Sequence, residues 1–296
     1  MTANRIKTSP KSVLDAKGLR PNKSLGQNFL VDQGIISKLI CAISPSPEDF
    51  IIEIGPGLGA LALPLARKAG KLVGLELDKN LADILEEAFN DEGLTNASVI
   101  HGDFMRMDLT GVIPKDRPYK IAGNLPYYIT TPAIRRIFSW DIKPAIVTLL
   151  LQKEAAAKLT ALPGSEDYGI LTLETAYHAK VTTICDVPPA CFYPQPKVQS
   201  RALRLDILET PPAASDKAAL FKVINAAFSM RRKTLLNCLV SGLNMSRNEA
   251  AAAVSACGFP ADIRGERLGL MEFDRLTAKL KLAPLNPINT NKRSGL

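Results

Sequence analysis

The chain has 296 residues and a formal net charge of +8, and 46% of its residues are hydrophobic. This length suits one large domain or a domain with a smaller partner, and the composition is that of an ordinary globular protein. No apolar run approaches the length of a bilayer span, and the polar first 11 residues lack the apolar core of a signal peptide, so we expect a cytoplasmic protein with no membrane association.

Most of the positive charge in excess lies near the two ends of the sequence. Residues 1–23 carry a net charge of +5 and residues 281–296 carry +3, so the sequence between them is balanced. We expect residues 1–22 and 283–296 to be flexible basic tails, which would strengthen binding to nucleic acid by releasing counterions. Solvated chain ends without a partner would have the same composition.

The five cysteines are scattered, and no two of them have the C-x-x-C spacing of a zinc site. Because only two histidines are available to join them, we expect no metal site. The spacing favours small buried thiols.

The first candidate ligand-binding stretch is a glycine-containing loop at residues 22–30, ahead of an amphipathic helix expected at 33–43. It carries the polar side chains of Lys23, Gln27 and Asn28. These groups suit contact with a ligand, and they would equally suit the lead-in to a helix.

An apolar strand expected at 50–54 runs into a glycine-rich turn that contains Gly55 and Gly57. Such a turn allows close backbone approach to a ligand, and the helix that follows favours anionic groups at its N-terminus. A second strand at 71–76 ends in Glu76, 21 residues after Gly55, where a carboxylate can accept hydrogen bonds from both ribose hydroxyls. The combination predicts an adenosine-containing cofactor, although a dinucleotide-dependent oxidoreductase shares the glycine turn.

A third strand at 98–101 ends in Gly102, Asp103 and Phe104. Asp103 could accept a hydrogen bond from the adenine amine of the cofactor, and Phe104 could pack against the adenine ring. An aspartate that caps a turn is the alternative interpretation.

A fourth strand at 119–123 ends where two acceptors are expected side by side. Asn124 supplies an amide oxygen, and Pro126 restricts Leu125 to extended geometry, which leaves the Leu125 carbonyl free to point outward. Two such acceptors suit an exocyclic amine, and Tyr127 would stack on the base that carries it. Placed where the N–H bonds point in the transition state, they would activate an adenine or cytosine amine without a strong base. A turn with two aromatic residues packed nearby is the alternative.

A proline-laced loop at 192–200 precedes the last strand, at 201–207. Its aromatic residue Phe192 could clamp a flipped base on the face opposite Tyr127, and Lys197 would suit a phosphate. Alternating strand and helix patterns up to this point predict an α/β fold with a Rossmann-like, doubly wound and mostly parallel sheet.

The pattern changes after a linker at 209–215, beyond which every periodic segment is helical. We therefore expect a catalytic domain at 23–208 and a small all-helical domain at 209–282. The basic run at 229–233 could contact phosphates, although three basic residues in a loop are often only solvated.

Several motifs in one order give the chain a close resemblance to a known family, the KsgA/RsmA-type 16S rRNA adenine N6-dimethyltransferases. The resemblance runs from about residue 23 to residue 280. It rests on the motifs Lys-Ser-Leu-Gly-Gln-Asn-Phe-Leu, Glu-Ile-Gly-Pro-Gly, Asn-Leu-Pro-Tyr-Tyr, Phe-Tyr-Pro-Gln-Pro-Lys-Val and Phe-Ser-Met-Arg-Arg-Lys.

The resemblance implies a class I methyltransferase that uses S-adenosylmethionine to dimethylate two adjacent adenosines near the 3′ end of 16S rRNA in the small ribosomal subunit. It also implies a role in ribosome biogenesis, and we expect a monomer. Tyr127 and Phe192 match the family's base-stacking positions, and Asn124 also faces the target amine. The positions that match cofactor contacts in the family are Asn28, Leu30, Gly55, Glu76, Asp103 and Asn124.

Two other interpretations stay open at this point. One is a related adenine methyltransferase that acts on 23S rRNA, although Leu125, Tyr128 and the long helical domain fit the small-subunit group better. The other is an RNA-binding ribosome assembly factor in which methylation is secondary. An intact set of Glu76, Asp103 and Asn124 argues for a working active site and leaves an assembly role possible as well.

Overall fold

The structure, a computed structural model, describes residues 9–280, with Tyr127 described by its backbone alone. Within this range the chain divides into two compact units. The first contains residues 9–159 and 178–209, and the second contains residues 160–177 and 210–280.

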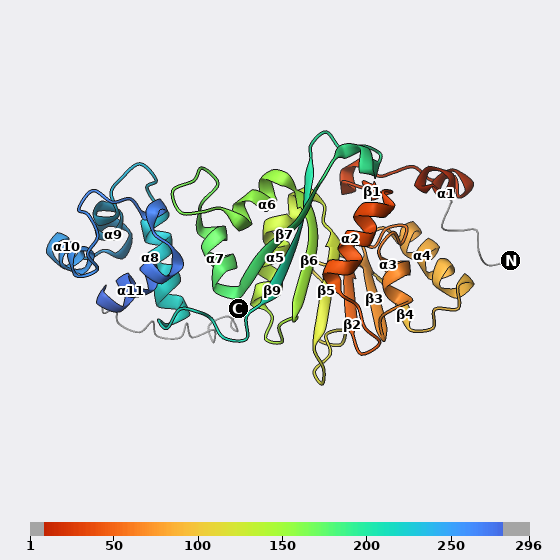
Figure 1. Ribbon diagram of the computed structural model, residues 1–296, viewed down its shortest axis with the longest axis horizontal. Coiled ribbons are helices and arrows are strands. Elements are labelled where there is room, and N and C mark those ends of the chain that lie inside the picture. Colours follow the sequence, from red (N-terminus) through yellow and green to blue (C-terminus); the bar gives the residue numbers. More distant parts are fainter. Residues whose placement is uncertain (1–8, 281–296) are drawn as a thin grey trace, which may run out of the picture. The chain divides into compact units, whose positions relative to one another are not determined.

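The first unit is built on a seven-stranded sheet with the strand order β4-β3-β2-β5-β6-β9-β7 (Figure 1). The five strands from β4 to β6 pair in parallel, and β9 and β7 add two antiparallel partners. The predicted α/β class with a mostly parallel sheet is therefore confirmed. The strands are β2 (Phe50–Ile54), β3 (Lys71–Glu76), β4 (Ala97–His101), β5 (Tyr119–Asn124), β6 (Ile146–Gln152), β7 (Ala179–Val187) and β9 (Ser200–Ile207).

Helices flank this sheet and bury their apolar faces on it. Apolar side chains of α2, α3 and α4 join one core cluster with strands β2, β3, β5 and β6, which fixes these helices beside the glycine turn. The helices of the unit are α1 (Pro10–Ala16), α2 (Gln33–Ile43), α3 (Ala62–Ala66), α4 (Lys79–Asp91), α5 (Thr130–Ser139) and α6 (Lys153–Thr160), with short 3₁₀ turns η2 (Lys23–Leu25), η3 (Tyr127–Ile129) and η4 (Pro189–Cys191).

The central strand β2 is covered on both faces. All five of its residues are buried, which explains why its sequence is a near-continuous apolar run rather than an alternating one. Its neighbour β5 leaves no room for a side chain at Gly123, where an added Cβ would lie 2.9 Å from the Ile54 carbonyl oxygen. Glycine is required there because the backbone of the next strand fills the space, and the next residue along β5 is Asn124.

A separate two-stranded antiparallel pair joins distant parts of the first unit. Strand β1 (Phe29–Leu30) pairs with β8 (Phe192–Tyr193), so that Phe29 lies opposite Tyr193 and Leu30 opposite Phe192. The loop at 22–30 and the proline-laced loop, about 160 residues apart in sequence, therefore meet.

The second unit is helical and has its own core. A capping box formed by Ser246 and Glu249 begins α10. Residues that form the core include Leu173, Leu220, Leu239, Val254 and Phe273. The helices are α7 (Ile170–His178), α8 (Lys217–Phe228), α9 (Leu235–Leu243), α10 (Arg247–Ala256) and α11 (Leu270–Leu280), with the 3₁₀ turn η5 (Gly265–Arg267).

The structure differs from the expected domain limits in two places. Residues 160–177 fall in the helical unit, whereas we expected them in the catalytic domain, because Tyr168, Leu173 and Tyr177 bury their side chains in the helical core. The expected flexible tail at 1–22 is wrong from residue 9 onward, because Pro10–Ala16 forms α1 and buries Leu14. The expected tail at 283–296 lies outside the described residues.

None of the helices in the part of the chain that the structure describes has the length and the apolar composition to cross a bilayer.

We predict that Gly123→Ala lowers the free energy of unfolding of the first unit by about 1–3 kcal/mol, because the new methyl group would meet the Ile54 carbonyl. Urea unfolding followed by the fluorescence of Trp140, the single tryptophan of the chain, measures this unit. Gly111→Ala is the matched control, since an added Cβ there meets no atom within 4 Å. Equal unfolding free energies for the two variants would contradict the packing argument.

Candidate active site

Three polar side chains stand at the carboxyl ends of neighbouring strands in the first unit. Glu53 of β2 lies opposite Gly74 of β3 and opposite Ala122 of β5. Glu76 and Asn124 each lie two residues further along their strands, and residues two apart on a strand share a face. The chain leaves β2 toward β3 on one side and returns to β5 on the other, so this group occupies the topological switch point of the sheet, where open α/β folds bind ligands.

A cavity of about 1650 Å³ opens at this edge of the sheet. Sites for a single drug-sized ligand measure roughly 300–1,000 Å³, so the cavity has room for more than one ligand group. The predicted site residues that line it are Asn28, Leu30, Gly55, Gly57, Glu76, Asp103, Phe104, Asn124, Leu125 and Phe192.

The Asn124 side chain is held in one orientation by a hydrogen bond. Its Nδ2 donates to the Asn28 carbonyl oxygen at 2.9 Å, and the Asn28 Nδ2 in turn donates to the Gly26 carbonyl at 2.9 Å. The next residue is fixed as well, because the Leu125 amide donates to the Leu150 carbonyl at 3.2 Å and the Leu125 side chain is buried. These bonds use one N–H of the Asn124 amide and the Leu125 N–H, and the Asn124 Oδ1 and the Leu125 carbonyl oxygen can act as acceptors.

The glycine turn packs against the β1 strand at Gly57 and Phe29. Gly57 has a φ of 56°. An added Cβ there would lie 3.2 Å from two atoms of the Phe29 ring. The left-handed backbone favours glycine at this position, and the close ring leaves little room for a side chain. The Gly57 amide donates to Glu76 Oε2 at 2.9 Å, which ties the turn to the end of β3.

Glu76 is a buried carboxylate with a free side. Its Oε1 accepts from the Asp78 amide at 2.9 Å and its Oε2 from the Gly57 amide. Burial raises the pKa of Glu76 above its ordinary value, against these two amide hydrogen bonds, which act to lower it. Each carboxylate oxygen can accept a second hydrogen bond, so the contacts within the protein leave capacity for ligand hydroxyls.

Glu53 is a buried acid that the sequence analysis missed. Its side chain lines the cavity and is 2% exposed, and its Oε2 has no hydrogen-bond partner among the described residues. Burial raises the pKa of Glu53 to about 8, and the nearby Glu76 carboxylate adds to the rise. The signal that could have identified it is a charged residue inside the apolar run at 50–54. Burial of an acid in such a strand costs free energy, and acids of this kind are often found at functional sites.

Asp103 and Phe104 line the cavity from the loop that follows β4. Asp103 Oδ1 accepts from the Met105 amide at 2.8 Å, so this residue does cap its turn, and its Oδ2 lies 3.5 Å from Arg106 Nε. The buried Phe104 ring packs edge-on against Trp140, with ring centroids 6.1 Å apart. The Asp103 carboxylate therefore has a structural contact and a position that faces the cavity.

The aromatic residues expected to stack on a base have different environments. Phe192 lines the cavity, but it is only 3% exposed and belongs to the core cluster of the sheet. The side chain of Tyr127 lies outside the described part of the structure. Its neighbour Tyr128 lines the cavity with a side chain that is 61% exposed.

The other polar residues proposed from the sequence lie elsewhere or are occupied. Gln27 donates to Asp78 at 2.8 Å and accepts from the Asn22 amide at 2.7 Å, so it stabilises the loop. Lys23 and Lys197 are exposed, and neither is part of the cavity wall.

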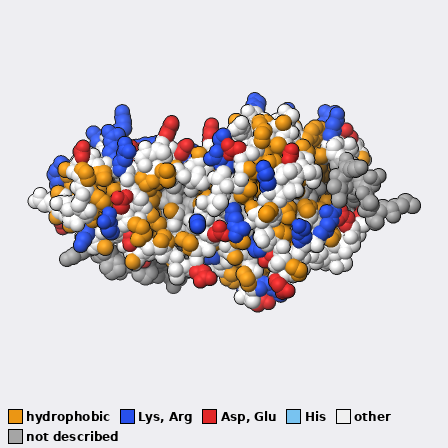
Figure 2. All heavy atoms as spheres, in the orientation of Figure 1, with side chains coloured by type: hydrophobic (Ala, Val, Ile, Leu, Met, Phe, Trp, Pro, Cys, Tyr) orange, Lys and Arg blue, Asp and Glu red, His pale blue; other side chains and the backbone are white. Residues whose placement is uncertain are grey.

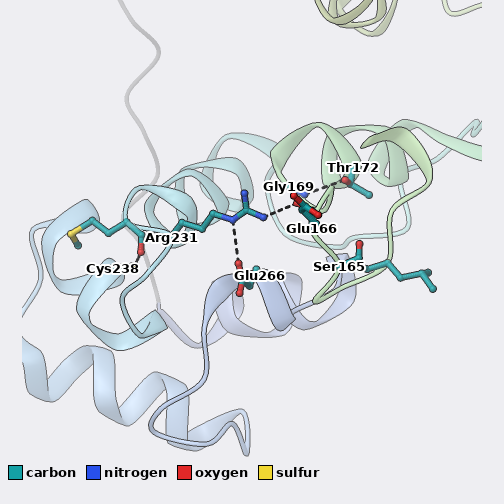
Figure 3. A network of polar contacts seen from close by, with 9 residues as sticks. Ser165, Glu166, Gly169, Thr172, Arg231, Cys238 and Glu266 are labelled. Atoms are coloured by element: carbon teal, nitrogen blue, oxygen red, sulfur yellow. Dashed lines mark hydrogen bonds and ion pairs between the residues drawn. The ribbon is translucent and has the colours of Figure 1, made fainter. Parts of the chain in front are cut away.

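Within the basic run at 229–233 of the helical unit, Arg231 makes structural contacts. Figure 3 shows its guanidinium between two acidic residues: one nitrogen donates to the Glu166 carbonyl at 2.6 Å, and another lies 3.4 Å from the Glu266 carboxylate. Both partners belong to the same unit. Arg232 and Lys233 are exposed as well, and contact of this run with phosphates stays a prediction.

Within residues 9–280 no group of three or more His, Cys, Asp or Glu side chains is arranged to hold a metal ion.

Comparison with known proteins identifies the same family as the motifs do. Residues 18–257 match the model of the family described as ribosomal RNA adenine dimethylase. A protein of Clostridium acetobutylicum named ribosomal RNA small subunit methyltransferase A is 37% identical over 271 residues, which cover 91% of this chain and 97% of that protein.

Two crystal structures resemble the chain over most of its length. A dimethyladenosine transferase from Plasmodium falciparum is 26% identical with a TM-score of 0.72, covering 84% of this chain and 95% of that one. The 23S rRNA methyltransferase ErmE is 25% identical with a TM-score of 0.69, covering 86% of this chain and 100% of that one.

We predict that Glu53→Gln changes how stability depends on pH. Because the folded-state pKa of Glu53 lies above its unfolded value, folding favours the protonated form, and the wild-type unfolding free energy falls as pH rises from about 4.5 to about 8, by up to about 1.4 kcal/mol per pH unit. A glutamine side chain cannot titrate, so the variant should gain on the wild type across this window. Urea unfolding at about pH 6 and about pH 8 tests this, with exposed Glu48→Gln as the control. Parallel pH dependences for Glu53→Gln and the wild type would contradict it.

Proposed function

The chain belongs to the ribosomal RNA adenine dimethylase family, and on this premise we propose that it transfers methyl groups from S-adenosylmethionine to two adjacent adenosines near the 3′ end of small-subunit rRNA. As a member of this family the protein is an rRNA adenine dimethyltransferase.

The chemistry of the cavity supports a donor that carries both an adenosine and a positive charge. The Glu76 carboxylate and the buried Glu53 oxygen, which has no partner among the described residues, are acceptors that would face a sulfonium or an ammonium group, and such a cation would favour the ionised form of both acids. Bound S-adenosylmethionine would supply a methyl group on a positively charged sulfur. Glu76 would accept from the ribose hydroxyls, and Asp103 and Phe104 would hold the adenine.

The remaining donor contacts fall on the glycine turn and the β1 strand. Gly55 and Gly57 let the backbone approach the donor, and Asn28 and Leu30 line the facing wall. In this assignment Asn28 has two roles: it contacts the donor, and its carbonyl oxygen orients the Asn124 side chain.

The target amine would be held by Asn124 Oδ1 and the Leu125 carbonyl oxygen. Two acceptors that take the two N–H bonds favour the pyramidal form of the amine, whose lone pair is then available to attack carbon rather than delocalised into the ring. Because both acceptors are fixed before substrate arrives, little reorganisation is needed at the moment of reaction. Neither a metal nor a covalent enzyme intermediate is part of the proposal.

The single observation that carries the proposal is the hydrogen bond from Asn124 Nδ2 to the Asn28 carbonyl. It selects the orientation of the amide in which the oxygen is left to accept. The opposite orientation would present a donor to an amine that itself donates, and would not support this chemistry.

Aromatic stacking would hold the flipped base. We assign Tyr127 as a stacking residue from its place in the Asn-Leu-Pro-Tyr-Tyr motif. Phe192 contributes the part of its ring that borders the cavity, while most of its surface packs in the core. Stacking of one base on an aromatic side chain contributes roughly 1–3 kcal/mol.

The choice of small-subunit rRNA rests on the sequence relatives. The relative that is 37% identical carries small-subunit RNA in its name, whereas the 23S rRNA methyltransferase is 25% identical. A role in ribosome assembly beside catalysis is compatible with either rRNA substrate. Lys and Arg side chains also stand out over the helical unit, which suits an RNA partner (Figure 2). We further propose that the protein acts as a monomer in the cytoplasm.

The direct test of the substrate is incubation with labelled S-adenosylmethionine and small subunits that lack the modification, followed by mapping of the labelled nucleotides. We expect label on two adjacent adenosines near the 3′ end of the small-subunit rRNA. Label on large-subunit RNA or on protein would overturn the substrate assignment.

We predict that Asn124→Ala lowers the rate of methyl transfer by about 100-fold or more, because one of the two acceptors is lost. The fold should be retained, since the side chain is only partly buried and its amide donates to a loop carbonyl rather than to the core. Methyl incorporation into unmodified small subunits measures the effect, and Trp140 fluorescence checks the fold. Asn90→Ala, an exposed position on α4, is the control, and wild-type turnover by Asn124→Ala would refute the assignment.

A further inference from the structure

Residues 9–19, here called the N-terminal arm, fold into a helix that the sequence analysis placed in a flexible tail. Ser9 caps α1 by accepting from the Ser12 amide, Pro10 occupies the first turn, and Gly18 ends the helix in the left-handed region with a φ of 65°. These are good local helix signals. A helix of seven residues is nevertheless too short to be stable in isolation, so its order depends on what it packs against.

The arm is anchored to the first unit by one apolar side chain and one ion pair. Leu14 is 2% exposed and packs in a cluster with Phe29 and Leu81. Lys17 Nζ lies 2.6 Å from Glu87 Oε2 on α4, but both side chains are half-exposed and the pair contributes little. Burial of the Leu14 side chain is therefore the main contribution that holds the arm in place.

The partners of Leu14 belong to the elements assigned above to the methyl donor. Phe29 is the residue whose ring lies against Gly57 of the glycine turn, and Leu58, the next residue of that turn, packs against the same cluster. Leu81 lies in the first turn of α4, just after Asp78, whose amide binds Glu76. Leu14 thus shares one apolar cluster with residues of the glycine turn and of the start of α4.

The arm also forms part of the cavity wall itself. Ala16 follows Val13 by three residues and Ser12 by four, which places it near both on the helix surface, and all three line the cavity that contains Glu53, Glu76 and Asn124. These three side chains are small, whereas the longer side chains of Lys11 and Lys17 also line the cavity. Further lining residues of the arm are Ser9, Pro10, Lys11 and Lys17.

We propose that the N-terminal arm is a wall of the methyl-donor site and that Leu14 is the residue that positions it. This rests on the function proposed above. Because the arm and the donor share one cavity, each contributes contacts and excludes water for the other, so docking of the arm and binding of the donor stabilise each other to the same extent. The arm is the least stable part of this wall, and it therefore exchanges between docked and open states more readily than the sheet beneath it.

The test compares Leu14→Ala in the full chain with Asp15→Ala, an exposed neighbour on the same helix. Calorimetry measures the Kd for S-adenosylmethionine, and limited proteolysis measures cleavage within the arm with and without the donor. We expect Leu14→Ala to weaken donor binding about tenfold, which corresponds to about 1.4 kcal/mol, and Asp15→Ala to bind as the wild type does. We also expect the donor to slow cleavage of the arm in the wild type and much less in Leu14→Ala.

A variant that starts at residue 20 provides the second measurement, with its fold checked by Trp140 fluorescence. It should bind the donor at least as weakly as Leu14→Ala does. Wild-type donor affinity in Leu14→Ala or in the shortened chain would overturn the role of the arm and leave the proposed function intact. A wild-type chain that does not bind S-adenosylmethionine would overturn the proposed function, and the arm's role with it.

Discussion

The hydrogen bond between the Asn124 side chain and the Asn28 carbonyl is the interaction on which the site depends. It joins the end of β5 to a loop that lies 96 residues earlier in the chain. Because it engages the amide nitrogen, it leaves the amide oxygen to accept a hydrogen bond from a ligand. Both ends are held by other contacts: Asn28 by the Gly26 carbonyl, and the backbone after Asn124 by β6. Removal of any of these supports would loosen an acceptor that has to be fixed in advance.

A second constraint is electrostatic. Glu53 and Glu76 are both buried near the ends of adjacent strands; burial raises both carboxyl pKa values, and the Glu76 charge adds to the rise at Glu53. A cationic methyl donor in the cavity would offset the cost of ionising these buried acids. Glu76 keeps its place through two backbone amides, whereas one oxygen of Glu53 has no partner among the described residues, which makes Glu53 the group most sensitive to what enters the cavity.

Much of the framework was predictable from the sequence, because local patterns determine it. Strand ends are visible in the sequence as apolar runs that stop at a glycine, an acid or a turn, as before Gly55, at the end of β3 and at Asn124. The ten predicted site residues other than Tyr127 all line one cavity. The capping box at Ser246 and the helical character of the C-terminal part likewise depend on neighbours within a few residues. The motifs also indicated the family, since their order along the chain is itself information in the sequence.

What the tertiary structure alone decided are pairings between residues far apart in the chain. Sequence periodicity could not indicate that β1 pairs with β8 or that residues 160–177 join the helical core. Nor could it indicate that Arg231 donates hydrogen bonds to Glu166 and Glu266. Nor could composition distinguish a basic tail from an arm: the charges of residues 9–19 are visible in the sequence, but the pocket that accepts Leu14 is made by Phe29 and Leu81. A short helix acquires its stability from such a pocket, and a pocket exists only once the chain has folded.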